Sequence, residues 1–139
     1  MLFHNSGIRL AADSSALFPY RDGIRKSGES VKTKMQYIQV QITFPTLESA
    51  EEAAEKIVDR RLAACAQIAG IVRSIYTWKG KREKCNEILL LAKTRAELFG
   101  QLVEAVRDGH PYECPQIVAV PLIAGNEDYL AWLDEQTAD

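Results

Sequence analysis

The sequence has few cysteines and no long apolar run, which are the features typical of disulfide-rich secreted proteins and of membrane-spanning proteins. Its three cysteines, Cys65, Cys85 and Cys114, are an odd number at wide spacings among 139 residues. A secreted disulfide framework usually shows an even and denser set, so we expect free thiols in a reducing compartment, the cytoplasm. No apolar run approaches the roughly 18 residues of a transmembrane helix, and the N-terminus lacks the apolar stretch of a secretory signal. We therefore expect no membrane partner.

The chain also has few histidines and a net charge close to zero, and these two features argue against several classes of function. Only His4 and His110 are present, so no Ser-His-Asp or Cys-His arrangement can be read and we expect no enzymatic activity. The 17 Lys/Arg and 19 Asp/Glu leave a net charge of −2, which gives no general attraction to nucleic acid. We expect a non-enzymatic protein without a nucleic-acid partner.

The chain divides into two parts of different character. Residues 1–34 carry six Lys/Arg against three Asp/Glu, are rich in small polar residues and sustain no helix or strand period. A second methionine, Met35, stands just before the first regular pattern. We expect residues 1–34 to be a disordered tail, an expression leader or an over-called start, and residues 35–139 to form one domain.

Hydrophobic periods in the second part predict the first half of a fold. Residues 37–44 alternate strictly and predict a half-buried strand that Pro45 ends. Thr46 or Ser49 then caps a helix. Two extended segments follow, over 63–78 with a bend or bulge at Gly70, and over 83–93. The expected apolar stripe of the helix is Leu47, Ala50, Ala54, Ile57, Val58 and Leu62.

The remaining patterns complete the topology. A capping box over 94–97 begins a second helix that Gly109 ends, a fourth strand spans 117–122, and a short helix follows Asn126. The order strand-helix-strand-strand-helix-strand predicts an α+β, ferredoxin-like βαββαβ sandwich with a short C-terminal helix. The hairpin of the second and third strands is longer than usual, so it should project and associate with other copies. The final helix is expected to turn Tyr129, Leu130, Trp132 and Leu133 inward.

The connector at residues 110–116 holds the densest group of chemically active side chains. Two prolines, Pro111 and Pro115, stiffen it and exclude regular structure between them. An imidazole (His110), a phenol (Tyr112) and a thiol (Cys114) are therefore held close to the edge of the sheet. This arrangement predicts either a rigid, packed loop or part of a metal site.

Five segments, taken together, resemble the divalent-cation-tolerance family, CutA, over about residues 36–135. The resemblance implies a stable homotrimer, similar in architecture to the PII signalling proteins, that is associated with copper tolerance and divalent-metal binding. It implies no required cofactor, with Cu(II) or another divalent metal as the ligand. The segments are Leu62-Ala63-Ala64-Cys65-Ala66, Tyr76-Thr77-Trp78-Lys79-Gly80-Lys81, Glu87 with Lys93-Thr94, His110-Pro111-Tyr112 with Pro115-Gln116, and Gly125 through Tyr129-Leu130 and Trp132.

The metal ligands of that family are carried over only in part. Some members place a cysteine in the first strand and a second histidine before His-Pro-Tyr, where this chain has Ile42, Thr43 and Gly109. Only His110 carries over, with Cys114 as an added candidate ligand. A closed site needs about four ligands, so any metal binding should be weak. In the plainer interpretation, His110 makes hydrogen bonds near the helix end.

A second function is a PII-like trimer that binds a small anionic effector for signalling. Its cleft between subunits would be lined by Trp78, Glu87, Lys93, His110 and Tyr112. Glu87 and Lys93 could instead form an ion pair at the surface or at a subunit interface. Three other classes of this topology lack their motifs: the aromatic third strand of an RNA-recognition module, the Cys-x-x-Cys loop of a metal chaperone, and the arginine-bearing phosphate loop of an acylphosphatase.

Overall fold

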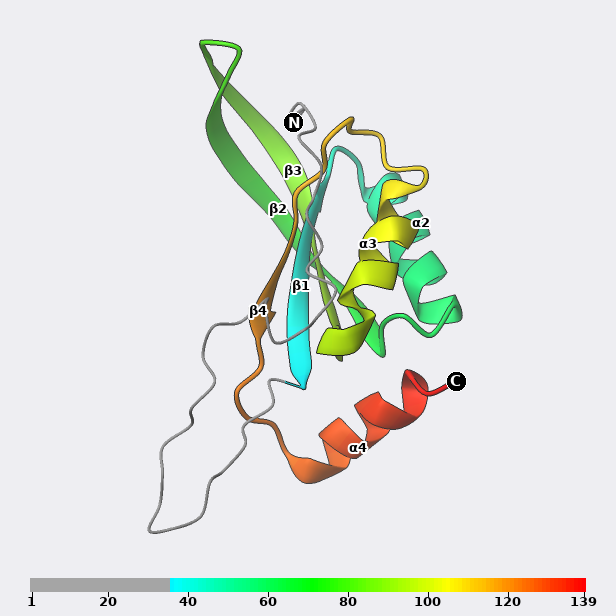
Figure 1. Cartoon of the computed structure of the whole chain (residues 1–139). Coiled ribbons are helices and arrows are strands. Elements are labelled where there is room, and N and C mark those ends of the chain that lie inside the picture. Colours follow the sequence, from blue (N-terminus) through cyan, green and yellow to red (C-terminus); the bar gives the residue numbers. More distant parts are fainter. Residues whose placement is uncertain (1–35) are drawn as a thin grey trace, which may run out of the picture.

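A computed structural model describes residues 36–139, and the expectations for residues 1–34 lie outside this range. Two helices, α2 and α3, pack on one face of a four-stranded antiparallel sheet with the strand order β2-β3-β1-β4 (Figure 1). This confirms the predicted α+β class and the predicted order of elements. The elements are β1 (Tyr37–Phe44), α2 (Leu47–Asp59), β2 (Cys65–Trp78), β3 (Lys81–Arg95), the short 3-10 helix η1 (Ala96–Leu98), α3 (Phe99–Arg107), β4 (Ile117–Pro121) and α4 (Glu127–Gln136).

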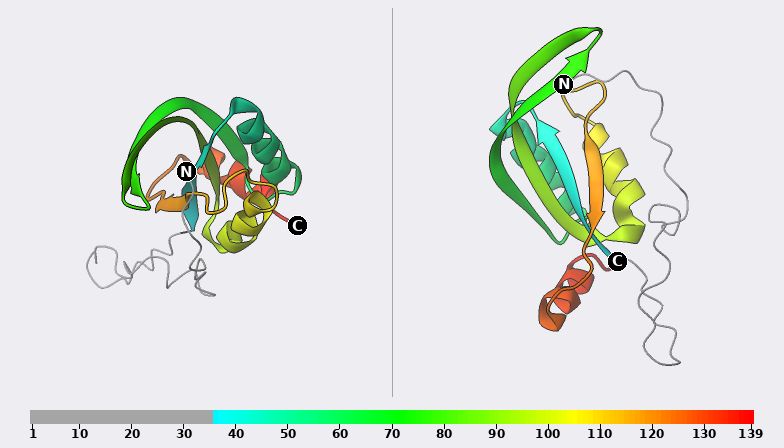
Figure 2. Two further views of the ribbon diagram at one scale, coloured as in Figure 1. Left: turned by 90° about the horizontal axis from the view of Figure 1, so that it is seen from above. Right: turned by 90° about the vertical axis from the view of Figure 1, so that its left-hand side faces the viewer.

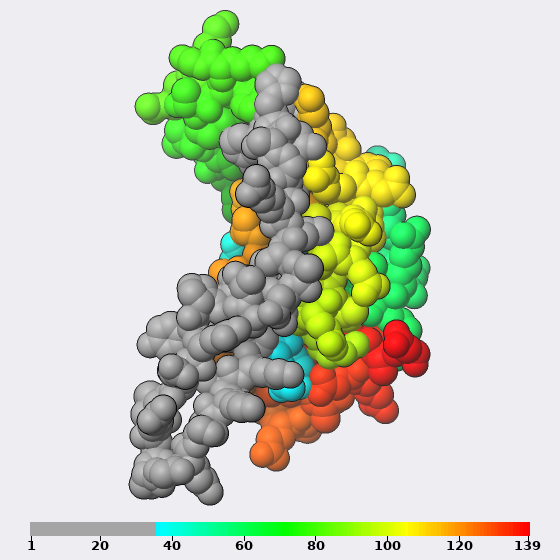
Figure 3. Space-filling view, viewed as in Figure 1, coloured from blue at the N-terminus to red at the C-terminus, as the bar shows by residue number. Residues whose placement is uncertain are grey.

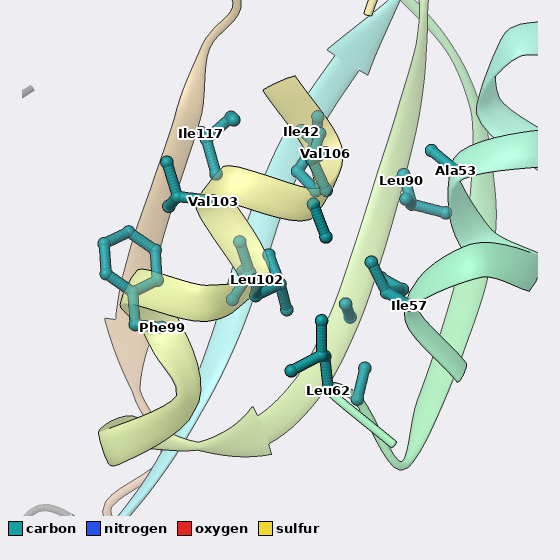
Figure 4. Close-up of a cluster of buried hydrophobic side chains, with 14 of the residues drawn as sticks. Ile42, Ala53, Ile57, Leu62, Leu90, Phe99, Leu102, Val103, Val106 and Ile117 are labelled. Carbon is teal, nitrogen blue, oxygen red and sulfur yellow. The ribbon is translucent and has the colours of Figure 1, made fainter. Parts of the chain in front are cut away.

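The core lies between the sheet and the two helices, as the alternation in β1 predicts. Ile38, Val40 and Ile42 are fully buried on the face that α2 and α3 cover. The predicted stripe of α2 is partly wrong, because Leu47 and Val58 are 50% and 38% exposed. Figure 4 shows core side chains contributed by the other elements, among them Ala53, Ile57, Leu90, Leu102, Val106 and Ile117.

The two predicted helix starts had different outcomes. Thr46 caps α2, and its hydroxyl accepts a hydrogen bond from the Ser49 N–H at 3.1 Å. The second capping box is wrong, because Thr94 is a fully buried residue of β3 whose hydroxyl donates to the Leu62 carbonyl at 2.7 Å. The chain enters α3 through η1, and Glu97 forms an ion pair with Arg95. The Thr94 side chain, which local spacing assigns to a helix cap, therefore makes a tertiary hydrogen bond to Leu62 instead.

The β2–β3 hairpin projects from the body, as its length predicted (Figures 1 and 2). β1 pairs with β3 only over Ile88–Arg95, so the segment before Ile88 pairs with β2 alone. We call residues 71–87 the arm, and its tip stands clear of the rest in Figure 3. Gly70, with φ +121° beside a register shift, confirms the predicted bulge at the base of the arm.

The final helix α4 is held mainly by polar contacts. Leu133 is fully buried, but Trp132 is 39% exposed, so the expectation that it turns inward is wrong. The Arg95 guanidinium donates to the Thr137 hydroxyl at 2.9 Å and to the Thr137 carbonyl at 2.6 Å. The Tyr37 hydroxyl donates to Asp134 at 2.8 Å. Within residues 36–139, the structure contains no helix with the length and apolar character needed to span a membrane.

The buried Thr94 hydroxyl yields a test of the packing between β3 and the segment after α2. Thr94→Val keeps the shape of the side chain but leaves the Leu62 carbonyl buried without its donor. We expect the free energy of unfolding to fall by about 1–3 kcal/mol. The control Thr77→Val, at an exposed position of β2, should change it by less than about 0.5 kcal/mol. Urea unfolding at one protein concentration measures both, and equal losses would contradict the role of Thr94.

Candidate functional site

The candidate site lies where the connector, residues 110–116, crosses the end of β1 and the base of the arm. Gly109, at φ +92°, ends the turn after α3 as predicted. The register of β1 with β3 pairs Phe44 with Ile88 and Thr43 with Leu89. Because side chains alternate along a strand, Thr43 and Glu87 lie on the sheet face opposite α2 and α3, which we call the open face.

His110 is fixed by hydrogen bonds at both of its ring nitrogens. Nδ1 accepts from the Tyr112 backbone N–H at 3.0 Å, so the proton of the neutral ring is on Nε2, which lies 3.0 Å from the Thr43 carbonyl oxygen. The ring stacks on Phe44 with centroids 4.6 Å apart. Burial lowers the pKa of His110, while the bond to Thr43 opposes this shift. The ring is therefore hydrogen-bonded, as the plainer interpretation expects, but its partners are Thr43 and Tyr112 and not the end of α3, and the lowered pKa favours a neutral imidazole.

Tyr112 and Glu87 form the most buried polar contact of the site. The Tyr112 hydroxyl donates to Glu87 Oε2 at 3.0 Å, and Glu87 is only 1% exposed. Burial, and then the bond to this carboxylate, raise the pKa of Tyr112, which keeps the phenol protonated as a donor. Two buried oxygens in the described part of the chain have no hydrogen-bond partner: Glu87 Oε1 and the Thr43 hydroxyl. A polar group left in this state is costly, so both oxygens need an explanation.

A phenol and a thiol extend the site along the arm. The Cys85 thiol donates to the Tyr76 hydroxyl at 3.8 Å, and both residues are half-buried. Burial, then the bond to Cys85, raises the pKa of Tyr76 to about 12. The thiol of Cys65 is also half-buried and lies 3.4 Å from the Tyr129 hydroxyl. At neutral pH the Tyr76 phenol is protonated and adds no charge to the site.

The two predicted metal ligands do not form a closed site within one subunit. Residues 36–139 hold no group of three or more His, Cys, Asp or Glu side chains that could bind a metal ion. Cys114 is half-buried on the same connector as His110. Both nitrogens of His110 are engaged, so a metal would have to displace the Tyr112 N–H from Nδ1 or the Thr43 carbonyl from Nε2. The residues present fit at most an open, weakly bound metal.

A single subunit brings together only part of the residue set predicted for the cleft between subunits, and the cleft itself stays a prediction. Glu87, His110 and Tyr112 meet at the connector, whereas Trp78 pairs with Lys81 at the tip of the arm. Lys93 lies six residues from Glu87 along β3, about 20 Å away, so the two cannot pair within one subunit. The sequence interpretation missed Thr43 and Phe44 as members of the site. The sequence feature that could have identified them is their position at the end of the predicted first strand, next to Pro45.

Comparisons with known proteins agree on one family. The family described as CutA1 divalent ion tolerance protein matches residues 38–136. The divalent-cation tolerance protein CutA of Thermus thermophilus is 46% identical over 98 residues, which cover 70% of this chain and 95% of that protein. Protein CutA of the mouse is 42% identical over 96 residues, or 69% of this chain, but the match spans only 54% of the mouse protein.

A solved structure supports the same assignment. The periplasmic divalent cation tolerance protein CutA of Archaeoglobus fulgidus superposes with a TM-score of 0.72 and is 35% identical. The match covers 73% of this chain and 99% of that one. Sequence and fold therefore agree over β1 to α4, and the chain belongs to the CutA1 divalent ion tolerance family.

Proposed function

We propose that the protein acts in divalent-cation tolerance as a non-enzymatic homotrimer in the cytoplasm, and that it binds Cu(II) or another divalent cation weakly through His110 and Cys114. Family membership supports the tolerance role. The observation that carries the metal proposal is the position of His110 and Cys114, both half-buried on one short connector. The lowered pKa of His110 favours the neutral imidazole, which is the form that coordinates a metal. The three cysteines are free thiols, which suits a reducing compartment.

Uncovered apolar surface and two free strand edges support self-assembly. Val118 and Val120 of β4 are 45% and 39% exposed, and their register with Gln41 and Gln39 places them on the open face. Ile71 and Ile75 on the arm are 71% and 58% exposed. The sheet ends in two different edges, β2 and β4. A contact between two different surfaces repeats around a closed ring, which suits a cyclic trimer.

The PII-like alternative gains no support from the comparisons, which give proteins named for CutA or for cation tolerance. The described site also disfavours an anionic ligand. The charged groups at the connector are the carboxylates of Glu87 and Glu113, and the neighbouring imidazole of His110 has a lowered pKa that favours its neutral form. Lys93, the cation expected to bind such a ligand, lies at a distance along β3 within the subunit.

Light scattering tests the oligomeric state. The wild type should have about three times the 15.5 kDa mass of the subunit at micromolar concentration. Val118→Asp places a charge on the open face and should weaken assembly, because a buried unpaired charge is costly. Val58→Asp, at a similarly exposed valine on α2, is the matched control and should leave the mass unchanged. A monomeric wild type would overturn the trimer.

Cu(II) titration under non-oxidising conditions tests the metal site. His110→Ala should abolish most of the binding, and Cys114→Ala should weaken it. Because burial lowers the pKa of His110, the ring stays neutral below the ordinary histidine value of about 6.5. The loss of copper affinity that protonation of His110 causes should therefore come at a lower pH than for an ordinary histidine. If His110→Ala bound copper as well as the wild type does, the site assignment would be wrong.

A further inference from the structure

Glu87 is a buried carboxylate that the described part of the subunit leaves half satisfied. Its side chain is 1% exposed, and the Tyr112 hydroxyl is the donor to Oε2, while Oε1 has no partner in the described part of the chain. Charged groups are seldom buried without a partner of opposite charge, because desolvation is costly. The ion pair of Arg95 with Glu97 does not involve this carboxylate. A donor from outside the described part of the subunit would satisfy Glu87 Oε1.

Lys93 is a cation on the same open face. It shares this face with Glu87 because both are odd-numbered positions of β3, and its register partner on β1 is Gln39. Its Nζ donates to the Gln67 side-chain oxygen at 2.5 Å, which leaves further N–H groups of the ammonium for another acceptor. Arg95, also at an odd-numbered position of β3, is engaged by Thr137 and Glu97.

We infer that Lys93 of the partner subunit pairs with Glu87 across the subunit contact. This rests on the proposed homotrimer and specifies which groups meet in it. In a ring of three identical subunits, each Glu87 would meet the next subunit's Lys93, so the same pair forms three times. The pair joins a buried anion and a cation that lie about 20 Å apart on one strand and cannot meet within a subunit.

Assembly must open a path to Glu87 Oε1, which the subunit's own atoms cover. Tyr112 is the side chain in contact with the carboxylate, and it stands on the open face at the connector. The pair requires this ring to move so that Oε1 becomes accessible, and rotamer changes of this kind are common when interfaces form. The Tyr112 hydroxyl also has to remain protonated, which its raised pKa ensures at neutral pH.

Sedimentation equilibrium on single and double variants tests the pair. Glu87→Gln and Lys93→Gln should each raise the concentration at which the trimer dissociates by at least roughly 30-fold. The double variant should raise it by far less than the product of the two effects, since both changes break one pair. The single charge reversals Glu87→Lys and Lys93→Glu should each prevent trimer assembly. The chain that carries both reversals should form the trimer again.

The controls separate this inference from the trimer itself. Glu52→Lys with Arg60→Glu makes the same charge exchange at exposed positions on and after α2, and it should shift the midpoint by no more than roughly twofold. If Glu87→Lys lost its far-UV circular dichroism, the glutamine cycle would decide. A trimeric wild type with independent effects of Glu87 and Lys93 would overturn the pair alone. A monomeric wild type would overturn both the pair and the trimer.

Discussion

The pairing of β3 with two neighbours of different length is the constraint on which the rest of the structure depends. β3 spans Lys81–Arg95 and pairs with β2 along its length, but with β1 only from Ile88 onward. Its C-terminal half is a central strand that carries the core under the helices. Its N-terminal half has no neighbour on the β1 side and becomes one side of the arm. One strand thus provides the core, the projection and the junction at which Glu87 lies.

The connector supplies hydrogen-bond partners for backbone groups near the end of β1. β1 ends at Phe44, opposite Ile88, and the arm begins there. The Thr43 carbonyl therefore lies close to the base of the arm. His110 binds that carbonyl and also the Tyr112 N–H, so one neutral ring satisfies two backbone groups. The ring can serve both groups only with the proton on Nε2. A structural role therefore fixes the tautomer and keeps the ring neutral, which is also the state that metal binding requires.

Regular elements could be predicted because their signals are local. Strict alternation identified β1, and positive φ angles confirmed Gly70 and Gly109 as the bulge and the helix end. Thr94 was misread because spacing alone cannot reveal that Leu62, distant in sequence, takes its hydroxyl. The burial of Glu87 was equally invisible, because it follows from the connector folding over the arm. The helical period predicted that Trp132 points inward. In α4, however, Leu133 is fully buried and Trp132 is 39% exposed, so the buried side of this short helix is narrower than the period suggests.

The charges at the connector favour a cation over an anion as a ligand of this site. At the connector a carboxylate is buried, an imidazole is neutral and the phenol of Tyr112 stays protonated, so none of these groups offers positive charge to a ligand. A cation entering the site gains a charged acceptor and meets no repulsion there, whether it is an ammonium group or a metal ion. An anion would face an uncompensated carboxylate in a poorly solvated corner.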